Sequence, residues 1–199
     1  MKTLGLLGGI ASGKSLVAKK LQDLGAVVLD ADRAGHEVLR LPHVKVTARS
    51  RWGASIFGSN GEIERKRLAA IVFARTGEGR RELECLEKLT HPEIGRRLQD
   101  QLNLLREQGV QVAVLDAPVM LKAGWDRFCD QIWFIDAPHE VRLKRAQTRG
   151  WTEDEFRARE LAQEPVERKR ELADLVLDNS GDIEYTHRQI ERLWHSLIG

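Results

Sequence analysis

The sequence predicts an α/β protein in which a mostly parallel sheet lies between two layers of helices. Short apolar segments recur along the chain with helical patterns between them, and parallel strands that are buried on both faces read as such continuous runs. A glycine-rich turn also follows the first segment directly. The expected strands are residues 4–7, 26–29, 110–115, 132–135 and 175–177.

Length and composition limit the alternatives. The 199 residues, of which 42% are hydrophobic, suffice for one core with a small inserted lobe but not for two ordinary domains. A net charge of +2 is too small to indicate nucleic acid as the main partner. Cys85 and Cys129 match no metal-ligand spacing, so we expect buried thiols in a reducing compartment. Without a signal-peptide pattern or a long apolar run, we expect a cytoplasmic protein with no membrane segment.

A long segment without strand patterns separates the second and third expected strands. It is longer than one crossover helix requires, so we expect a helical insertion over residues 41–108. Within it, Thr90 and Glu93 fit a capping box with Pro92 in the first turn, which predicts that a helix begins near His91. The core is expected to comprise residues 1–40, 110–138 and 173–199.

A second charged, helical region covers residues 139–172, and we interpret it as a lid. Thr152 and Glu155 fit another capping box in its middle, which predicts two helices with a break near residues 150–151. The C-terminal residues 183–198 carry apolar side chains at helical spacing and predict a packing helix.

Residues 8–15, Gly-Gly-Ile-Ala-Ser-Gly-Lys-Ser, match the pattern G-x-x-x-x-G-K-[ST] between an expected strand and an expected helix. Glycine lets the backbone turn so that successive N–H groups converge on a polyphosphate at a helix N-terminus. In such a P-loop, Lys14 reaches the β- and γ-phosphates of ATP, and the Ser15 hydroxyl ligates Mg²⁺. The residues expected to contact the nucleotide are Gly9, Ile10, Ala11, Ser12, Gly13, Lys14, Ser15 and Leu16.

The motif predicts a P-loop NTPase-type fold but not one activity, because kinases, ATPases and GTPases share it. Residues 32–35 fit the D-x-x-G pattern of GTPases, but they follow the first strand-helix unit immediately. The sequence has no N-K-x-D for guanine and no G-x-G-x-x-G for a Rossmann dinucleotide site. We therefore favour a small-molecule kinase, whose acceptor could be a nucleotide or another metabolite, with a non-catalytic nucleotide switch as the alternative.

Four aspartates follow expected strands. Asp30 and Asp32 stand at the carboxyl end of the second one, which opens on the same crevice as the P-loop. A carboxylate there could accept the proton of an attacking hydroxyl, or simply cap the next helix, and we favour Asp32 as the base or substrate contact. Asp116 and Asp136 could assist the metal or serve as turn residues; we favour Asp116 for the metal and a structural role for Asp136.

Arg142, Arg145 and Arg149 share one face of the helix after the fourth strand, because they are spaced i, i+3 and i+7. Guanidinium groups suit phosphate oxygens and can stabilise charge that develops on a transferring phosphoryl group. The alternative is a solvated basic face paired with Glu140 or with the acidic residues after Trp151. Beside a P-loop, we expect Arg145 and Arg149 to contact the nucleotide.

The assembled motifs resemble the dephospho-CoA kinase family over nearly the whole chain. The P-loop is followed by Val-Leu-Asp-Ala-Asp at 28–32, Thr-His-Pro at 90–92 and Asp-Ala-Pro at 116–118. The late sequence Ala-Asp-Leu-Val-Leu-Asp-Asn-Ser-Gly at 173–181 completes the order and spacing of that family. The P-loop alone is generic, whereas the combination is specific.

The resemblance implies transfer of the γ-phosphoryl group of ATP, with Mg²⁺, to the ribose 3′-hydroxyl of dephospho-CoA, the last step of coenzyme A synthesis. It implies that Asp32 is the base, that Arg145 is the lid arginine on the transferring phosphate, and that His91 lies in an acceptor-binding insertion. It places Asn179 and Gly181 in the segment around adenine.

The segment after the third strand carries the main departure from the family pattern. Pro118 and Leu121 correspond to the acceptor side and are expected substrate contacts. Lys122 replaces the usual glutamate, which reverses a charge there. Arg159 and Gln163 resemble the R-x-x-x-Q of the family's lid.

Overall fold

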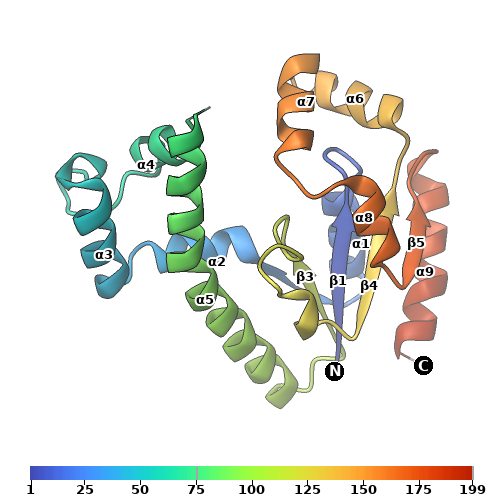
Figure 1. The fold of residues 1–199 in the computed structure, drawn as a ribbon. Helices are drawn as coiled ribbons and strands as arrows, with labels where there is room; N and C mark the ends of the chain where they lie inside the picture. Colours follow the sequence, from blue (N-terminus) through green and yellow to red (C-terminus); the bar gives the residue numbers. More distant parts are fainter. Residues whose placement is uncertain (75, 199) are drawn as a thin grey trace. The chain divides into compact units, whose positions relative to one another are not determined.

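The computed structural model describes residues 1–74 and 76–198. Within them, five parallel strands form one sheet in the order β2-β3-β1-β4-β5 (Figure 1). Each strand lies at one of the five predicted apolar runs, which confirms the predicted α/β class. The strands are β1 (Lys2–Gly8), β2 (Val27–Asp30), β3 (Val112–Asp116), β4 (Gln131–Asp136) and β5 (Leu175–Asp178).

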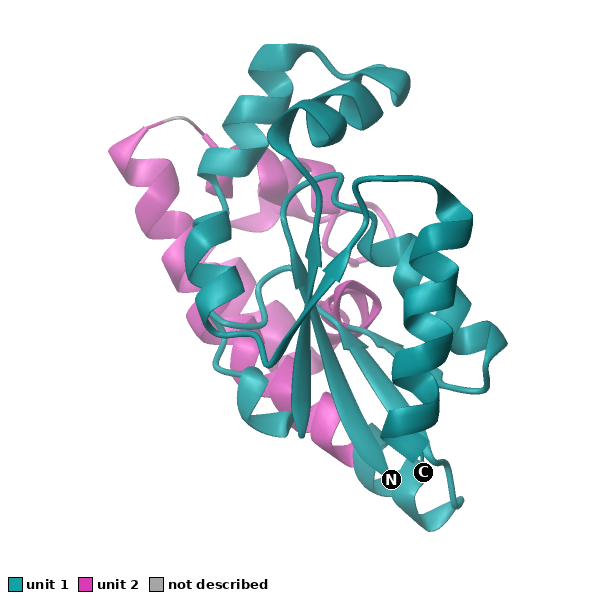
Figure 2. Cartoon of the chain, turned by 90° about the vertical axis from the view of Figure 1, so that its right-hand side faces the viewer, with its two compact units in different colours: residues 1–30, 101–199 teal, residues 31–100 magenta. Residues whose placement is uncertain are grey.

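The chain forms two compact units (Figure 2). One comprises residues 1–30 and 101–199 and holds the whole sheet. The other comprises residues 31–100, whose regular structure in the described part is helical apart from an isolated bridge between Phe57 and Ile63.

Helices cover both faces of the sheet unit. Helices α1 (Lys14–Asp23) and α9 (Ile183–Ile198) pack on one face, and Leu4 and Leu6 of β1 are fully buried in the core that they share. On the opposite face, α8 (Val166–Glu171) lies in front of β1 (Figure 1). The C-terminal packing helix predicted from its apolar spacing is therefore confirmed.

The helical unit has a small core of its own. Leu68 and Val72 are buried there together with Ile56 and Phe57. Its helices are α2 (Ala31–Val38), α3 (Pro42–Trp52), η1 (Ala54–Ile56), α4 (Arg65–Val72) and the first part of α5 (Gly77–Glu107).

The helix start predicted near His91 is wrong. Helix α5 runs without a break from Gly77 to Glu107 and contains Pro92 in its interior. The Thr90 hydroxyl donates a 2.8 Å hydrogen bond to the carbonyl oxygen of Leu86, one turn back, so it does not cap a new helix. Leu98 and Leu102 after the proline are fully buried, and Leu83 and Leu86 before it pack partly buried against the core of the helical unit, so packing sustains the helix where the sequence alone suggests an interruption.

The predicted break in the lid region is confirmed. Helix α6 (His139–Thr148) and α7 (Glu153–Leu161) are separated by a short turn. The Thr152 hydroxyl accepts a hydrogen bond from the Glu155 amide at 3.2 Å, and the Glu155 carboxylate accepts one from the Thr152 amide at 2.8 Å, which completes the capping box. The sequence analysis did not predict α8, which follows them.

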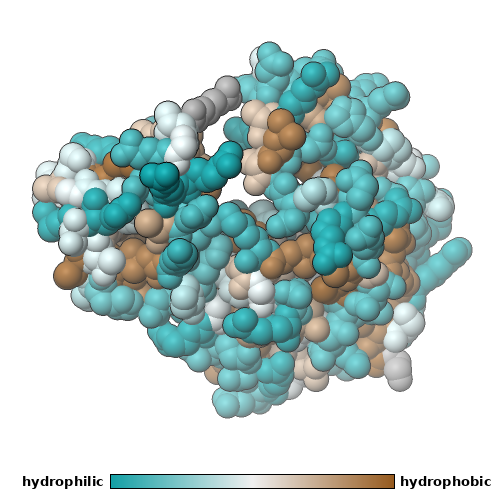
Figure 3. Space-filling model, in the orientation of Figure 1, coloured by the Kyte–Doolittle hydropathy of each residue, from teal (hydrophilic) through white to brown (hydrophobic). Residues whose placement is uncertain are grey.

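The face of the molecule shown in Figure 3 is mostly polar. On the face shown in Figure 3, hydrophobic residues occur in small groups among hydrophilic ones. Within the described ranges, none of the helices combines the length and the apolar character that crossing a bilayer requires. The free thiols of Cys85 and Cys129 are half-buried rather than fully buried as expected, and burial raises the pKa of the Cys129 thiol to about 12.

Candidate active site

The P-loop, residues 9–13, joins the central strand β1 to the start of α1. Gly13 adopts a φ of +102°, which side chains disfavour, and a Cβ there would lie 2.0 Å from Nδ2 of Asn179. Ala11 also has a positive φ, of +58°. Because the N-cap residue Gly13 offers no side chain, the first amides of α1 are left to an incoming anion.

Two side chains from distant parts of the chain hold the carbonyl oxygen of Ser12. It accepts hydrogen bonds from Asn179 Nδ2 at 2.6 Å and from Arg145 Nη1 at 3.2 Å. Arg145 Nη2 also donates to the backbone oxygen of Asn179 at 2.9 Å, and Thr186 donates to Asn179 Oδ1 at 2.9 Å. The pKa of Arg145 is lowered, first by burial and then by the charge of Arg149. These contacts hold the backbone of the loop.

Arg142 of α6 supports the loop. It is 5% exposed, donates from Nε to the carbonyl oxygen of Ala137 at 3.1 Å, and reaches the carbonyl oxygen of Ile10 at 3.5 Å. An ion pair joins its guanidinium to Glu160 of α7. Arg142 thus pairs with an acidic residue after Trp151, as the alternative for the arginines held, but it is buried and does not belong to a solvated face.

Lys169 of α8 supports the first residue of the motif, and the sequence analysis missed it. The residue is 3% exposed, and its Nζ donates to the carbonyl oxygen of Gly8 at 3.3 Å and to Gln163 Oε1 at 2.7 Å. Its pKa is lowered to about 8, mainly by burial and then by the charge of Lys14. Nothing in the polar sequence around Lys169 signals this contact, because Gly8 is 161 residues away.

The aspartates of the sheet unit fall into two groups. Asp30 and Asp116 are register partners at the ends of β2 and β3, and Asp116 also lies opposite Leu6 of β1. Both carboxylates therefore stand on the strands at one side of the P-loop. Asp136, on the other side, pairs with Arg170 at 2.6 Å. Asp136 therefore forms an ion pair, whereas Asp30 and Asp116 lie beside each other on neighbouring strands.

Other residues singled out in the sequence lie around this loop or near the lid. Arg149 ends α6, and Gly181 follows Asn179 in an exposed turn. A cavity of about 220 Å³ lies between the segment after β3 and the turn before α8. Its lining includes Pro118, Lys122 and Gln163.

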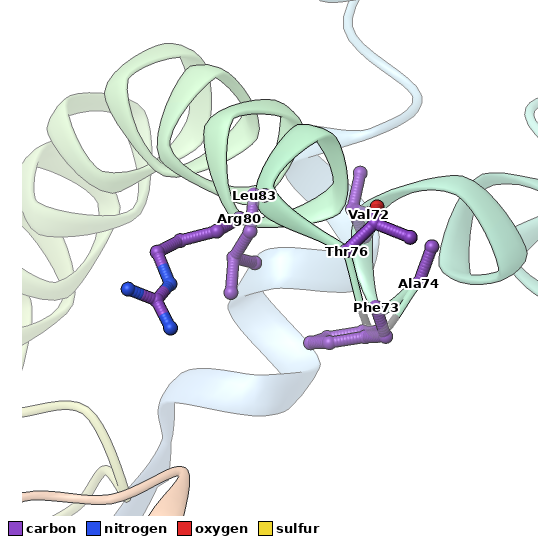
Figure 4. A pocket seen from close by; sticks show the side chains of 7 residues that line it. Val72, Phe73, Ala74, Thr76, Arg80 and Leu83 are labelled. Carbon is purple, nitrogen blue, oxygen red and sulfur yellow. The ribbon is translucent and has the colours of Figure 1, made fainter.

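Two predicted site residues belong to the helical unit. Asp32 lies in the first turn of α2 rather than on the strand, and His91 lies within α5. The same unit holds a cavity of about 510 Å³, where the exposed Phe73 and Arg80 are among the lining residues (Figure 4). An apolar wall with one guanidinium suits a ligand that has both an apolar part and a negative charge.

A parallel sheet with a P-loop after its central strand, backed by arginines of α6, places the protein in the P-loop NTPase class, which includes kinases. The comparison with known families agrees, since the family model described as Dephospho-CoA kinase matches residues 2–185. The chain belongs to the dephospho-CoA kinase family, whose members are ATP-dependent kinases.

Individual relatives cover nearly the whole chain. A dephospho-CoA kinase from Carboxydothermus hydrogenoformans is 40% identical over 189 residues, which are 94% of this chain and 90% of that protein. A crystal structure from Thermus thermophilus, 31% identical, superposes with a TM-score of 0.82 and covers 100% of this chain and 98% of its own. A dephospho-CoA kinase from Campylobacter jejuni, 21% identical with a TM-score of 0.67 over 99% and 97% of the two chains, shares the fold.

Proposed function

We propose that the chain transfers the γ-phosphoryl group of ATP to the ribose 3′-hydroxyl of dephospho-CoA, which yields CoA and ADP. The observation that supports this most directly is a P-loop whose carbonyl oxygens accept hydrogen bonds from Arg142 and Arg145. The chain that carries it belongs to the dephospho-CoA kinase family. The half-buried free thiols suit a reducing compartment, and we place the reaction in the cytoplasm.

The residues present fit a nucleotide polyphosphate. The uncapped amides of α1 provide donors, and Lys14 stands at the first position of that helix. Arg145 holds the back of the loop through Ser12, so a small rearrangement of its guanidinium can bring it to a phosphate oxygen. In this proposal Arg145 and Arg149 balance the charge that develops during transfer.

The residues also fit Mg²⁺. The described residues contain no cluster of three or more histidine, cysteine or acidic side chains, and Mg²⁺ in kinases is commonly held by one or two protein oxygens together with phosphates. Ser15, in the first turn of α1, and Asp116 or Asp30 would supply those oxygens. Bound there, the ion would neutralise phosphate charge.

The remaining roles concern the acceptor. We propose that Asp32 accepts the proton of the attacking 3′-hydroxyl, because a carboxylate is the usual base for this step in kinases. His91, Pro118 and Leu121 are proposed acceptor contacts. Lys122 then adds a positive charge near the acceptor, which suits its phosphates.

A coupled assay tests the proposal. Purified protein is mixed with MgATP and dephospho-CoA while ADP release is followed, with a control that lacks the acceptor. We expect ADP formation that depends on dephospho-CoA, with CoA as the second product. Turnover with a different alcohol and none with dephospho-CoA would contradict the proposed substrate, while turnover that ignores every acceptor would indicate an ATPase.

A further inference from the structure

Arg142 of α6 contacts both the P-loop and α7, and its side chain is almost completely buried. The guanidinium packs so closely on Gly9 that a Cβ there would lie 2.8 Å from Nη1 and 3.0 Å from Cζ. The same Cζ lies 5.7 Å from the centre of the Phe156 ring, which is fully buried. The side chain is therefore held against the backbone of the loop.

Helix α7 meets this guanidinium with two side chains one turn apart. Phe156 provides the ring, and Glu160, four residues later, forms an ion pair with Arg142 Nη1 through Oε1. The second carboxylate oxygen of Glu160 lies 3.6 Å from Nδ1 of His139. The Arg142 side chain is 6% exposed, so loss of the carboxylate would leave its charge poorly compensated. The position of the guanidinium therefore depends on Glu160.

The backbone that Arg142 contacts includes a peptide unit of the P-loop. Arg142 Nη1 reaches the carbonyl oxygen of Ile10 at 3.5 Å. Because a peptide unit is planar and trans, the N–H of Ala11 points away from that oxygen, and a contact that fixes the carbonyl also orients the amide. Ala11 has a φ of +58°, which is uncommon for a residue with a Cβ and persists where the surroundings hold it. Backbone amides are the groups with which a P-loop cradles phosphates.

We infer that Glu160 is a positioning residue for the nucleotide. Through Arg142 it holds the backbone of Gly9 and Ile10 in the arrangement that presents the Ala11 amide to a phosphate. The inference rests on the proposed function, because that phosphate belongs to ATP. A loop already held in its binding conformation loses less conformational entropy when the ligand arrives, so the contact should strengthen nucleotide binding.

A double-mutant cycle tests the inference. Glu160→Gln, Arg142→Gln and the double variant are compared with the wild type by titration calorimetry with the Mg²⁺ complex of the β,γ-imido analogue of ATP. Each single variant should bind the analogue about tenfold more weakly, and the double variant no more weakly than Arg142→Gln, because Glu160 acts through Arg142. On charge alone, removal of a carboxylate would strengthen the binding of a polyanion, so weaker binding of Glu160→Gln reports positioning.

Steady-state kinetics adds a second measurement. With saturating dephospho-CoA, the KM for ATP of Glu160→Gln should rise by about tenfold while kcat changes by less than about threefold, since the held backbone serves the bound nucleotide and the transition state alike. A residue that only stabilised the fold would lower the melting temperature and leave the affinity of the folded protein unchanged.

Glu153→Gln is the matched control, since Glu153 lies on the same helix and pairs with the exposed Arg157 at 2.6 Å. It should bind the analogue as the wild type does. Thermal unfolding shows which variants are folded at the temperature of the titration. If Arg142→Gln is not, Arg142→Lys replaces it in the cycle, because lysine keeps the charge but lacks the planar fork of guanidinium.

Two results would overturn the inference while leaving the proposed function intact. One is folded Glu160→Gln that binds the analogue as tightly as the wild type or more tightly. The other is a double variant in which the two losses multiply to about a hundredfold, which would mean that the residues act independently. Absence of analogue binding by the wild type would overturn both the inference and the proposed function.

Discussion

Gly13 shows how one backbone position joins the P-loop to the far end of the chain. Its left-handed conformation turns the chain into α1, and the lack of a Cβ makes room for the Asn179 amide. That amide holds the Ser12 carbonyl, to which Arg145 also donates. The structure shows the Asn179 side chain engaged with the loop itself, and the place of its segment around adenine stays a prediction.

Replacing Gly13 with alanine should therefore damage the site in two ways. The strained backbone should lower the free energy of unfolding by about 1–2 kcal/mol, and displacement of Asn179 should weaken nucleotide binding by about tenfold or more. Gly25→Ala is the matched control, because Gly25 has a φ of +108° and no atom within 4 Å of an added Cβ. Urea unfolding and calorimetry check both variants; equal nucleotide affinity in the two would refute the role of the Asn179 contact.

Asp32→Asn tests the proposed base. The variant should keep its ATP affinity, while kcat should fall by about 10²-fold or more because an amide cannot accept the proton. Steady-state kinetics with dephospho-CoA measures the change. Asp23→Asn, which alters an exposed carboxylate paired with Lys19, serves as the control. Turnover of Asp32→Asn within about threefold of the wild type would exclude Asp32 as the base.

At the residue scale, local pattern predicted some of the site and missed the rest. The P-loop was predictable because its glycines, lysine and serine are neighbours in sequence. Lys169 was not, because it pairs with the carbonyl oxygen of Gly8, which precedes it by 161 positions. Such pairs leave no periodic signal in one sequence.

At the scale of elements, the strands were easier to predict than the helices. Continuous apolar runs mark strands that are covered on both sides, and all five were found. Helix α8 has only six residues, Val-Glu-Arg-Lys-Arg-Glu, without an apolar stripe, so periodicity could not reveal it. In α5 a local capping signal was overridden by the packing of a long helix.

Helix α7, which begins with a capping box, is connected to the P-loop through Arg142 of α6. Glu160 near the end of this helix holds Arg142, which reaches the Ile10 carbonyl. Thr152→Ala removes the cap and should destabilise α7 by about 1 kcal/mol, so amide hydrogen exchange over residues 153–161 should accelerate. In the control Thr148→Ala, a hydroxyl that bonds back to the Lys144 carbonyl is lost, and exchange over the same residues should stay unchanged. Unaltered exchange in Thr152→Ala would show that the cap does not support the helix.

At the scale of the whole molecule, the sheet unit gathers charge at one place. Cations from α1, α6 and α8 lie near one another at the carboxyl end of β1, where the Lys169 side chain is buried. Burial of the Lys169 ammonium beside other cations lowers its pKa, so the charged form of this side chain lowers the free energy of unfolding.

The stability of the free protein should therefore depend on Lys169 and on pH in a defined direction. Because the pKa of Lys169 is about 8 when folded, against an ordinary value of 10.5, the unfolded chain holds more protons between these two values. The wild type should consequently gain stability relative to Lys169→Met as the pH rises from about 8 to 10.5, by about 1.4 kcal/mol for each unit of pKa difference. Below about pH 8 the difference between the two proteins should be constant, since the lysine is then charged in both states.

Urea unfolding at pH 7, pH 8.5 and pH 10 without nucleotide measures this difference, and groups that titrate in both proteins cancel from it. Lys19→Met provides the control, because the Lys19 side chain is 67% exposed and its charge stays hydrated in the folded state. The difference between wild type and Lys19→Met should not grow over this range. If the wild type gains nothing over Lys169→Met between pH 8 and pH 10, the buried ammonium does not carry the cost that its surroundings imply, and its charge must be balanced by the protein alone.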